Sequence, residues 1–184
     1  MANALGPSRL ASPELLAQTD ALAGRVLAAS GVSHPPVPEN IVLYLGPETV
    51  IEYFDWTSLI GAVTHVGGRW VFGINRNDPP GRRRFTLMHE FKHALDGLRT
   101  VRDYRSYRKG MPKPLEEYLA DRFAVVVLMP EEWVRAAARY ERRVERLAWR
   151  FGVSAEAMTL RLRELGLPVL PSNYEHGRQR RKDH

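Results

Sequence analysis

The stretch RRRFTLMHEFKHALDG, residues 82–97, contains two histidines and a glutamate within a segment of helical periodicity. Apolar residues recur in it at intervals of four: Leu87, Phe91 and Leu95. This spacing predicts a helix with one apolar face. His89 and His93 then lie on one face, one turn apart, so that both imidazoles can reach a single metal ion. The chain must therefore fold so that another element supplies a further ligand.

Glu90 directly follows the first histidine and lies about 100° around the helix from it. At that angle its carboxylate does not readily join the two imidazoles, but it can reach a water molecule bound to the metal. Zinc lowers the pKa of such a water to about 7, and a nearby carboxylate can take its proton. The pattern therefore predicts Zn²⁺ as the cofactor and Glu90 as the general base.

The third ligand is expected from PLEEYLADRFAVVVLMP, residues 114–130, a second segment of helical periodicity. Glu117 and Asp121 are four residues apart and share a face of that helix. Glu117 would complete a His2Glu set, with Glu116 as the competing ligand. Asp121, one turn further on, would hydrogen-bond the free ring nitrogen of a ligand histidine and fix its tautomer.

Together, these two segments resemble the ImmA/IrrE family of metallopeptidases. In the family, arginine, phenylalanine and threonine lead into the His-Glu-x-x-His pattern, as Arg84-Phe85-Thr86 does here. The family's later helix reads E-x-x-A-(N/D)-x-F-A, followed by a leucine-rich end and Met-Pro. The matching positions are Glu117, Ala120, Asp121, Phe123, Ala124 and Leu128-Met129-Pro130. The preceding hairpin that ends in Ile74-Asn75 and the closing stretch LAWRFGVSAEAMTLRLRELGL also fit, so the resemblance covers about residues 15–167.

The resemblance implies a zinc-dependent peptidase with a gluzincin-like site. In that site His89, His93 and Glu117 are the ligands and Glu90 is the base. Known members cleave or inactivate helix-turn-helix repressors, and thereby switch on mobile-element excision, phage genes or stress responses. The expected partner is therefore a protein substrate, a transcriptional repressor. This chain departs from the family at Lys92, where glycine is common, and the lysine is expected to add a cation near the site.

A donor that stabilises the oxyanion is also expected, but the residues do not decide which one it is. The candidates are Tyr118, Tyr104, Tyr107 and His65. An exposed edge of the hairpin formed by residues 61–75 is the expected place for the substrate, which would add to it as a strand.

The first part of the chain is predicted to contain one helix and several short strands. Ser12-Pro13-Glu14 is typical of a helix start, and Gly31 is the expected end. Residues 34–40 form a proline-rich connector. Four runs rich in branched and aromatic residues are the predicted strands: 41–45, 49–54, 61–66 and 69–75. Gly67-Gly68 predicts a hairpin between the last two.

The C-terminal part is predicted to be helical and to resemble a helix-turn-helix. Its turn is expected at Gly152, with Ser154 as the cap of a recognition helix in which Arg161 and Arg163 are available for phosphates or bases. The alternative is a helical hairpin packed on the peptidase core. The alternative is favoured because the segment is short and its leucines must be buried: Leu160, Leu162 and Leu165.

The expected fold class is α+β. Residues 12–130 would form a zincin-like metallopeptidase domain with a small antiparallel sheet. Residues 131–168 would form a helical, helix-turn-helix-like C-terminal subdomain, and residues 169–184 a disordered basic tail. A chain of 184 residues with 44% hydrophobic composition is long enough to bury one such core.

Composition excludes some classes of protein and leaves others open. The absence of cysteine excludes disulfides and thiolate metal sites. No apolar run approaches the roughly 18 residues that span a bilayer, and the first residues lack the features of a secretory signal. A cytoplasmic protein without a membrane partner is therefore expected. The net charge of +6 makes DNA a second, less favoured partner.

The expected function is hydrolysis of a peptide bond in a repressor by a zinc-dependent endopeptidase. The alternative function is that of a DNA-binding or repressor-binding regulator, an antirepressor that acts without proteolysis.

Overall fold

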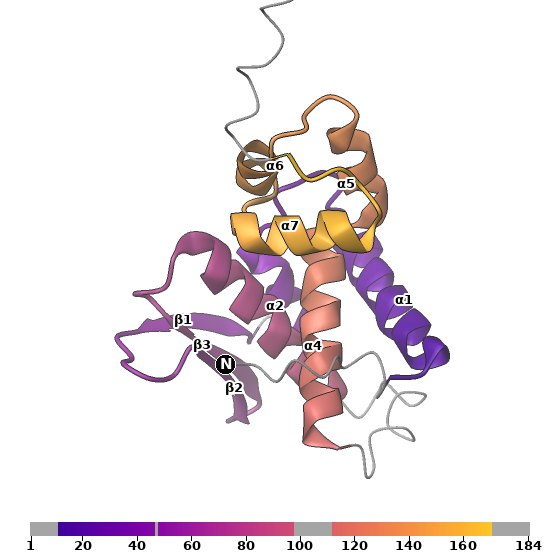
Figure 1. Ribbon diagram of the computed structural model, residues 1–184. Helices are drawn as coiled ribbons and strands as arrows, with labels where there is room; N and C mark the ends of the chain where they lie inside the picture. Colours follow the sequence, from indigo (N-terminus) through magenta and orange to yellow (C-terminus); the bar gives the residue numbers. More distant parts are fainter. Residues whose placement is uncertain (1–10, 47, 98–111, 171–184) are drawn as a thin grey trace, which may run out of the picture.

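A computed structural model of the chain describes residues 11–46, 48–97 and 112–170. Its elements form a small sheet, a pair of central helices that include the two motifs with the candidate ligands, and a group of shorter helices at one end (Figure 1). The described part is α+β, as expected. None of its helices is both long enough and apolar enough to cross a membrane. The tail beyond residue 170, expected to be disordered, lies outside the described residues.

Helix α1, Pro13–Ser30, begins and ends where the sequence predicts. The N–H of Leu15 donates to the hydroxyl of Ser12 at 3.3 Å and to the carbonyl of Ser12 at 3.1 Å, so Ser12 caps the first turn with both groups. Gly31 ends the helix with φ of 70°, a left-handed conformation that glycine adopts without steric cost.

The predicted strand at residues 41–45 is wrong, because these residues belong to a 3₁₀-helix, η2, Glu39–Leu45. The proline-rich connector leads directly into it, and the N–H of Ile41 bonds to the carbonyl of Pro38. Ile41 and Val42 are neighbours in sequence and both are buried. A strand with one buried face would have turned one of them away from the core.

The sheet contains β1, Val50–Phe54, β2, Gly61–Val66, and β3, Arg69–Asn75, in the order β1-β3-β2. Strands β2 and β3 form the predicted antiparallel hairpin. Gly67 and Gly68 both have positive φ, as the favoured two-residue turn requires.

Strand β1 pairs with β3 in parallel, so the sheet is mixed and the expected antiparallel sheet is wrong. The reason lies in residues 55–60, which carry the chain past the end of β3 so that β1 and β2 lie on opposite sides of it. Asn75 holds this connection in place. Its side-chain amide donates to the carbonyl of Trp56 at 2.9 Å and to that of Leu59 at 3.1 Å.

Helix α2, Pro80–Gly97, packs on the sheet, and helix α4, Lys113–Leu128, packs on α2. Both correspond to segments that the sequence predicts as helices. Phe91 of α2 packs edge-on against Phe72 of β3 and against Phe123 of α4, with ring centroids 6.4 and 6.0 Å apart. These three buried rings join the sheet, α2 and α4 into one core.

The remaining helices, α5, Glu131–Ala138, α6, Val144–Phe151, and α7, Ala155–Glu164, lie at the end of α4 (Figure 1). The expected boundary at residue 130 falls between α4 and α5. Apolar residues of α5, α6 and α7 nevertheless belong to the same buried cluster as those of α2 and the sheet. Ser154 caps α7 as predicted, since its hydroxyl accepts from the N–H of Ala157 at 3.1 Å.

Arg161 does not have the exposure that the sequence interpretation assigned to it. It is only 4% exposed, its Nε donates to the carbonyl of Met129 at 3.0 Å, and its Nη1 bonds to Glu164 at 2.7 Å. The expectation that it is available for phosphates or bases is therefore wrong, because this side chain binds the end of α4. Arg163, two residues on, is exposed.

Replacing Arg161 with leucine is expected to lower the free energy of unfolding by about 2 kcal/mol, because the buried carbonyl of Met129 loses its donor. The measurement is chemical denaturation followed by far-UV circular dichroism. Arg163→Leu is the matched control, since it removes an exposed arginine from the same helix and should change stability by no more than about 0.5 kcal/mol. Equal effects of the two substitutions would contradict a special role for the Arg161 contact.

Candidate metal centre

Helix α2 directs its two histidines toward α4. Phe91 points into the core, and this orientation sets the angle of the helix about its own axis. His89 and His93 then lie side by side on a half-buried face, with their Nε2 atoms 3.1 Å apart. Thus the predicted arrangement of two imidazoles one turn apart is present in the structure.

Helix α4 brings Glu117 to the same point. Its carboxylate oxygens lie 3.3 Å from Nε2 of His89 and 3.7 Å from Nε2 of His93. Among the described residues, these three form a group whose ligand atoms all lie within 4.8 Å of one another. A tetrahedral ion at about 2.0–2.1 Å from each ligand would hold the ligand atoms about 3.3 Å apart, so the observed separations fit one ion. Glu116, the competing ligand, is not part of this group.

Asp121 lies one turn beyond Glu117 and contacts the ring nitrogen of His89 that does not face the other two candidate ligands. Its Oδ1 is 2.8 Å from Nδ1 of His89, a distance that suits a hydrogen bond from Nδ1–H to the carboxylate. With the proton on Nδ1, the lone pair of the ring lies on Nε2, which faces His93 and Glu117. The geometry thus orients the imidazole for metal binding.

The two histidines have opposite pKa shifts. Burial lowers the pKa of His89, but the hydrogen bond to Asp121 and the negative charges of Asp121, Glu90 and Glu117 outweigh it, so that the net shift is upward. The pKa of His93 is lowered, first by burial and then by its proximity to His89. Without a metal, the pair therefore gains its first proton on His89.

Glu90 is partly buried on the side of α2 that faces the sheet. Burial raises the pKa of its carboxyl group, and the negative charge of Glu117 adds to this, while His89 acts in the opposite direction. A carboxylate with a raised pKa holds a proton more readily than an exposed one, which suits a group that accepts and returns protons near neutral pH.

Gly61, the first residue of β2, is a part of this site that the sequence analysis did not identify. A Cβ at this position would collide with Cγ2 of Thr86 and would lie 3.3 Å from Oε1 of Glu90. The backbone of β2 therefore runs directly against the candidate base. The only signal in the sequence was a glycine at the start of a strand. Such a glycine can mark a close approach of the backbone to another element, but it does not identify that element.

Lys92, which was expected to add a cation near the site, is paired with an acidic residue. It is fully buried, and its Nζ bonds both carboxylate oxygens of Asp96, at 2.6 and 2.7 Å. The cation that it adds near the site is therefore compensated by an acid one turn further along α2.

The candidates for an oxyanion donor are placed unevenly. Tyr104 and Tyr107 lie outside the described residues. Tyr118, on α4, packs against the small apolar cluster around Leu115 and Leu119. His65 packs on Trp70 and lies four residues beyond Gly61, about 13 Å further along the strand. The identity of the donor stays a prediction.

A family model for M78 peptidases, described as the IrrE N-terminal-like domain, matches residues 44–163. The chain belongs to this family. The matched M78 range contains α2 and α4 with all of the clustered residues, and it confirms the resemblance to the ImmA/IrrE metallopeptidases that the two motifs indicated.

Other comparisons concern the fold of this M78 family member. No curated protein matches the sequence. A solved structure of a Mycobacterium tuberculosis transcriptional regulator is similar, with a TM-score of 0.60 and 20% sequence identity. The match covers 79% of this chain but only 46% of that regulator, so the chain spans less than half of its length. At this level of identity the likeness concerns the fold alone.

Asp121→Asn is expected to weaken zinc binding about 10- to 100-fold near pH 8, because the ligand ring of His89 loses its orienting carboxylate. The substitution also removes the main cause that raises the pKa of His89. Protons and metal compete for this imidazole, so the acid-side loss of affinity should begin at a lower pH than in the unchanged protein. Competition with a chromophoric chelator across pH measures both effects.

Glu116→Gln is the matched control for this experiment, since it removes an acid next to Glu117 without touching the cluster. Its zinc affinity should equal that of the unchanged protein. A loss of zinc in Glu116→Gln, with none in Asp121→Asn, would show that the ligand set has been assigned to the wrong acids.

Proposed function

We propose that this M78 family member is a zinc-dependent endopeptidase that cleaves a helix-turn-helix transcriptional repressor. The single observation that carries the proposal is the convergence of His89, His93 and Glu117 from two helices, with Glu90 beside them. A cluster of this composition, in a chain that belongs to a metallopeptidase family, supports a catalytic site more than a structural one, because only three protein ligands converge.

The residues of the chain have distinct roles in the proposed reaction. His89, His93 and Glu117 would hold the ion, and Asp121 would keep His89 in the tautomer that binds it. Bound zinc supplies a Lewis acid that polarises the peptide carbonyl and acidifies a water molecule. The carboxylate of Glu90 accepts the proton of the attacking water and delivers it to the leaving amine.

The edge of the sheet beside Glu90 is the proposed place for the substrate backbone. Strand β2 is the last strand in the order β1-β3-β2 of the described sheet, and its first residue lies against Glu90. An extended peptide that adds to β2 would therefore pass close to the base. A structure of a complex with the peptide bound at another surface would contradict this placement.

The repressor is proposed as substrate because of the resemblance to the ImmA/IrrE family, whose members act on such proteins. The M. tuberculosis protein of similar fold carries the name of a transcriptional regulator, which describes that protein and is consistent with a regulatory setting. Such a substrate would place the reaction in the cytoplasm.

Glu90→Gln is expected to lower the rate of repressor cleavage by at least about 100-fold, because the amide cannot accept the proton of the water. Zinc content should stay near one ion per chain, since Glu90 is not a ligand in the proposed site. The assay incubates each protein with the repressors encoded beside its gene and follows the products by mass spectrometry. Removal of zinc with a chelator should abolish cleavage by the unchanged protein, and readdition should restore it. Equal cleavage by the two proteins would exclude Glu90 as the base.

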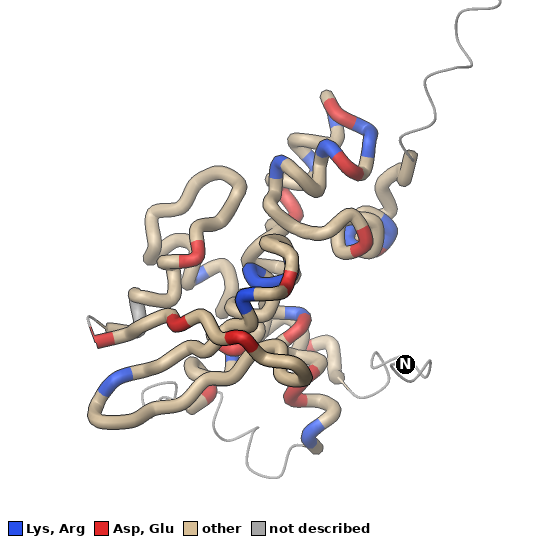
Figure 2. Tube along the Cα trace, turned by 90° about the vertical axis from the view of Figure 1, so that its left-hand side faces the viewer, with Lys and Arg blue, Asp and Glu red and all other residues tan. Residues whose placement is uncertain are grey.

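The alternative is a regulator that binds DNA or the repressor without proteolysis. The observation that favours it is the pair α6 and α7, joined at Gly152, which has the order of a helix-turn-helix. Against DNA, Arg161 is buried, and acidic residues are intermixed with basic ones over the C-terminal helices (Figure 2). A gel shift whose affinity falls steeply with salt would support DNA binding. A repressor that is inhibited equally by Glu90→Gln and by the unchanged protein would support an antirepressor.

A further inference from the structure

A groove leads from the candidate metal centre to the C-terminal helices. It has a volume of about 850 Å³ and is lined by α2, α4 and α7. Asp121 lies in its wall and also contacts His89, so one side chain joins the groove to the candidate ligands. Phe85 lies one turn before His89 on α2, and Val125 lies one turn beyond Asp121 on α4. Phe85 and Val125 therefore lie about 6 Å along their helices from His89 and Asp121.

The wall contributed by α7 has an apolar centre and acidic ends. Ala157 and Leu160 line the groove, and Leu160 is 60% exposed although it is a large apolar residue. The expectation that Leu160 is buried is therefore wrong. Met158 and Leu162, on another side of the helix, fill the core instead.

The charges on this wall are unfavourable for DNA. Glu156 and Glu164 of α7 line the groove together with Asp121 of α4. Of the two arginines in the lining, Arg161 is bound to Met129 and Glu164, and Arg82 lies 3.7 Å from Asp78. Exposed Glu156 has no ion-pair partner among the described residues. Its carboxylate would repel a phosphate group and attract a cationic side chain, whereas Glu164 is also bound by Arg122 and Asp121 by His89.

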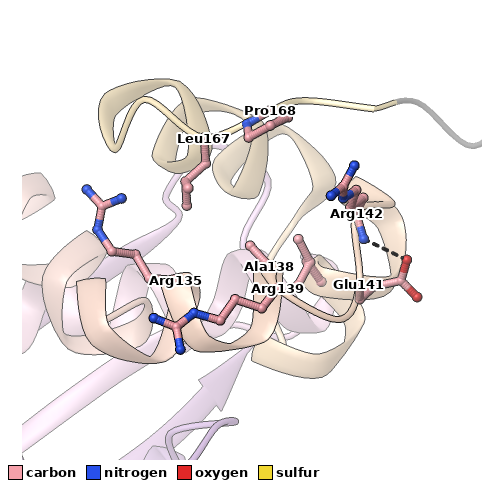
Figure 3. A pocket seen from close by; sticks show the side chains of 8 residues that line it. Arg135, Ala138, Arg139, Glu141, Arg142, Leu167 and Pro168 are labelled. Carbon is pink, nitrogen blue, oxygen red and sulfur yellow. Dashed lines mark hydrogen bonds between the residues drawn. The ribbon is translucent and has the colours of Figure 1, made fainter.

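A second, smaller hollow is not connected to the helices that carry the candidate ligands. It has a volume of about 300 Å³ and lies between α5 and residues 167–168 (Figure 3). Its arginines surround an apolar floor, but Arg135 already bonds Glu131 and the carbonyl of Leu165. None of its lining residues belongs to α2 or α4.

We propose that the outer face of α7, centred on Leu160 and Glu156, is a substrate-recognition wall of the peptidase. It would take a segment in which a large apolar side chain lies next to a lysine or arginine. The apolar side chain would enter the groove between Phe85, Val125 and Leu160, and the cation would lie near Glu156. The inference rests on the proposed function and gives the helix-turn-helix-like part of the chain a role in reading protein rather than DNA.

The proposed occupant agrees with the proposed substrate. Surfaces that bind DNA are rich in lysine and arginine, and the helices that carry them have apolar residues on the opposite face. When such a helix of a repressor unfolds, its segment would present apolar side chains and lysine or arginine side chains within a few residues of one another. The same pairing would exclude acidic and fully polar segments, which would limit cleavage to few proteins.

The test uses four fluorescein-labelled 15-residue peptides on one serine- and glycine-rich frame. Their central positions combine leucine or serine with arginine or glutamate. Binding to the full-length, zinc-loaded Glu90→Gln protein is measured by fluorescence anisotropy, so that no cleavage interferes. The leucine–arginine peptide is expected to bind most tightly. A Leu160→Ser substitution should weaken binding of the leucine peptides about tenfold and leave the serine peptides unchanged. A Glu156→Lys substitution should reverse the preference for arginine over glutamate.

Trp149→Ser is the matched control, because Trp149 is 85% exposed on α6 and does not line the groove. Equal binding of the four peptides, or equal effects of Leu160→Ser and Trp149→Ser, would overturn the inference. Displacement of the bound peptide by a DNA duplex would overturn it too. Failure of the proposed function is seen separately, as absence of zinc-dependent repressor cleavage by the unchanged protein, and it does not alter which peptides bind.

Discussion

The edge-on contact of Phe91 with Phe72 and Phe123 is the constraint on which the rest of the structure depends. A helix with a buried ring at one position has little freedom to rotate, because interiors are close-packed and rotation would open a void. With Phe91 fixed, the face of α2 that carries His89 and His93 can only turn toward α4. The convergence of the two histidines with Glu117 is thus a consequence of core packing, and it does not depend on contacts among these polar residues alone.

The same reasoning explains how much of the site the sequence could predict. Periodicity placed His89, His93 and Glu117 on helical faces, and the need for a third ligand selected the partner helix. These inferences depend on spacing within one helix, which a sequence displays directly. The position of Gly61 against Glu90 depends on how a strand packs on a helix thirty residues away, and no local pattern encodes such a contact.

The wrong predictions have a common cause in tertiary context. Residues 41–45 have strand-like composition, but the prolines before them and the burial of two consecutive side chains favour a 3₁₀-helix. The order of the sheet depends on the path of residues 55–60, which Asn75 determines through hydrogen bonds. Arg161 is buried and Leu160 is exposed, the reverse of what their chemical types suggest. An arginine can bury its guanidinium group when a carbonyl is available to accept its hydrogen bond.

The contact at Gly61 has a consequence for the comparison of related chains. A side chain at this position would meet Thr86 and Glu90 of α2, so β2 and α2 would have to lie further apart. Position 61 can therefore act as a marker in sequence alignments. Glycine there indicates a strand backbone packed against the helix that carries the candidate base, whereas a larger residue would identify a relative whose strand and helix are spaced differently.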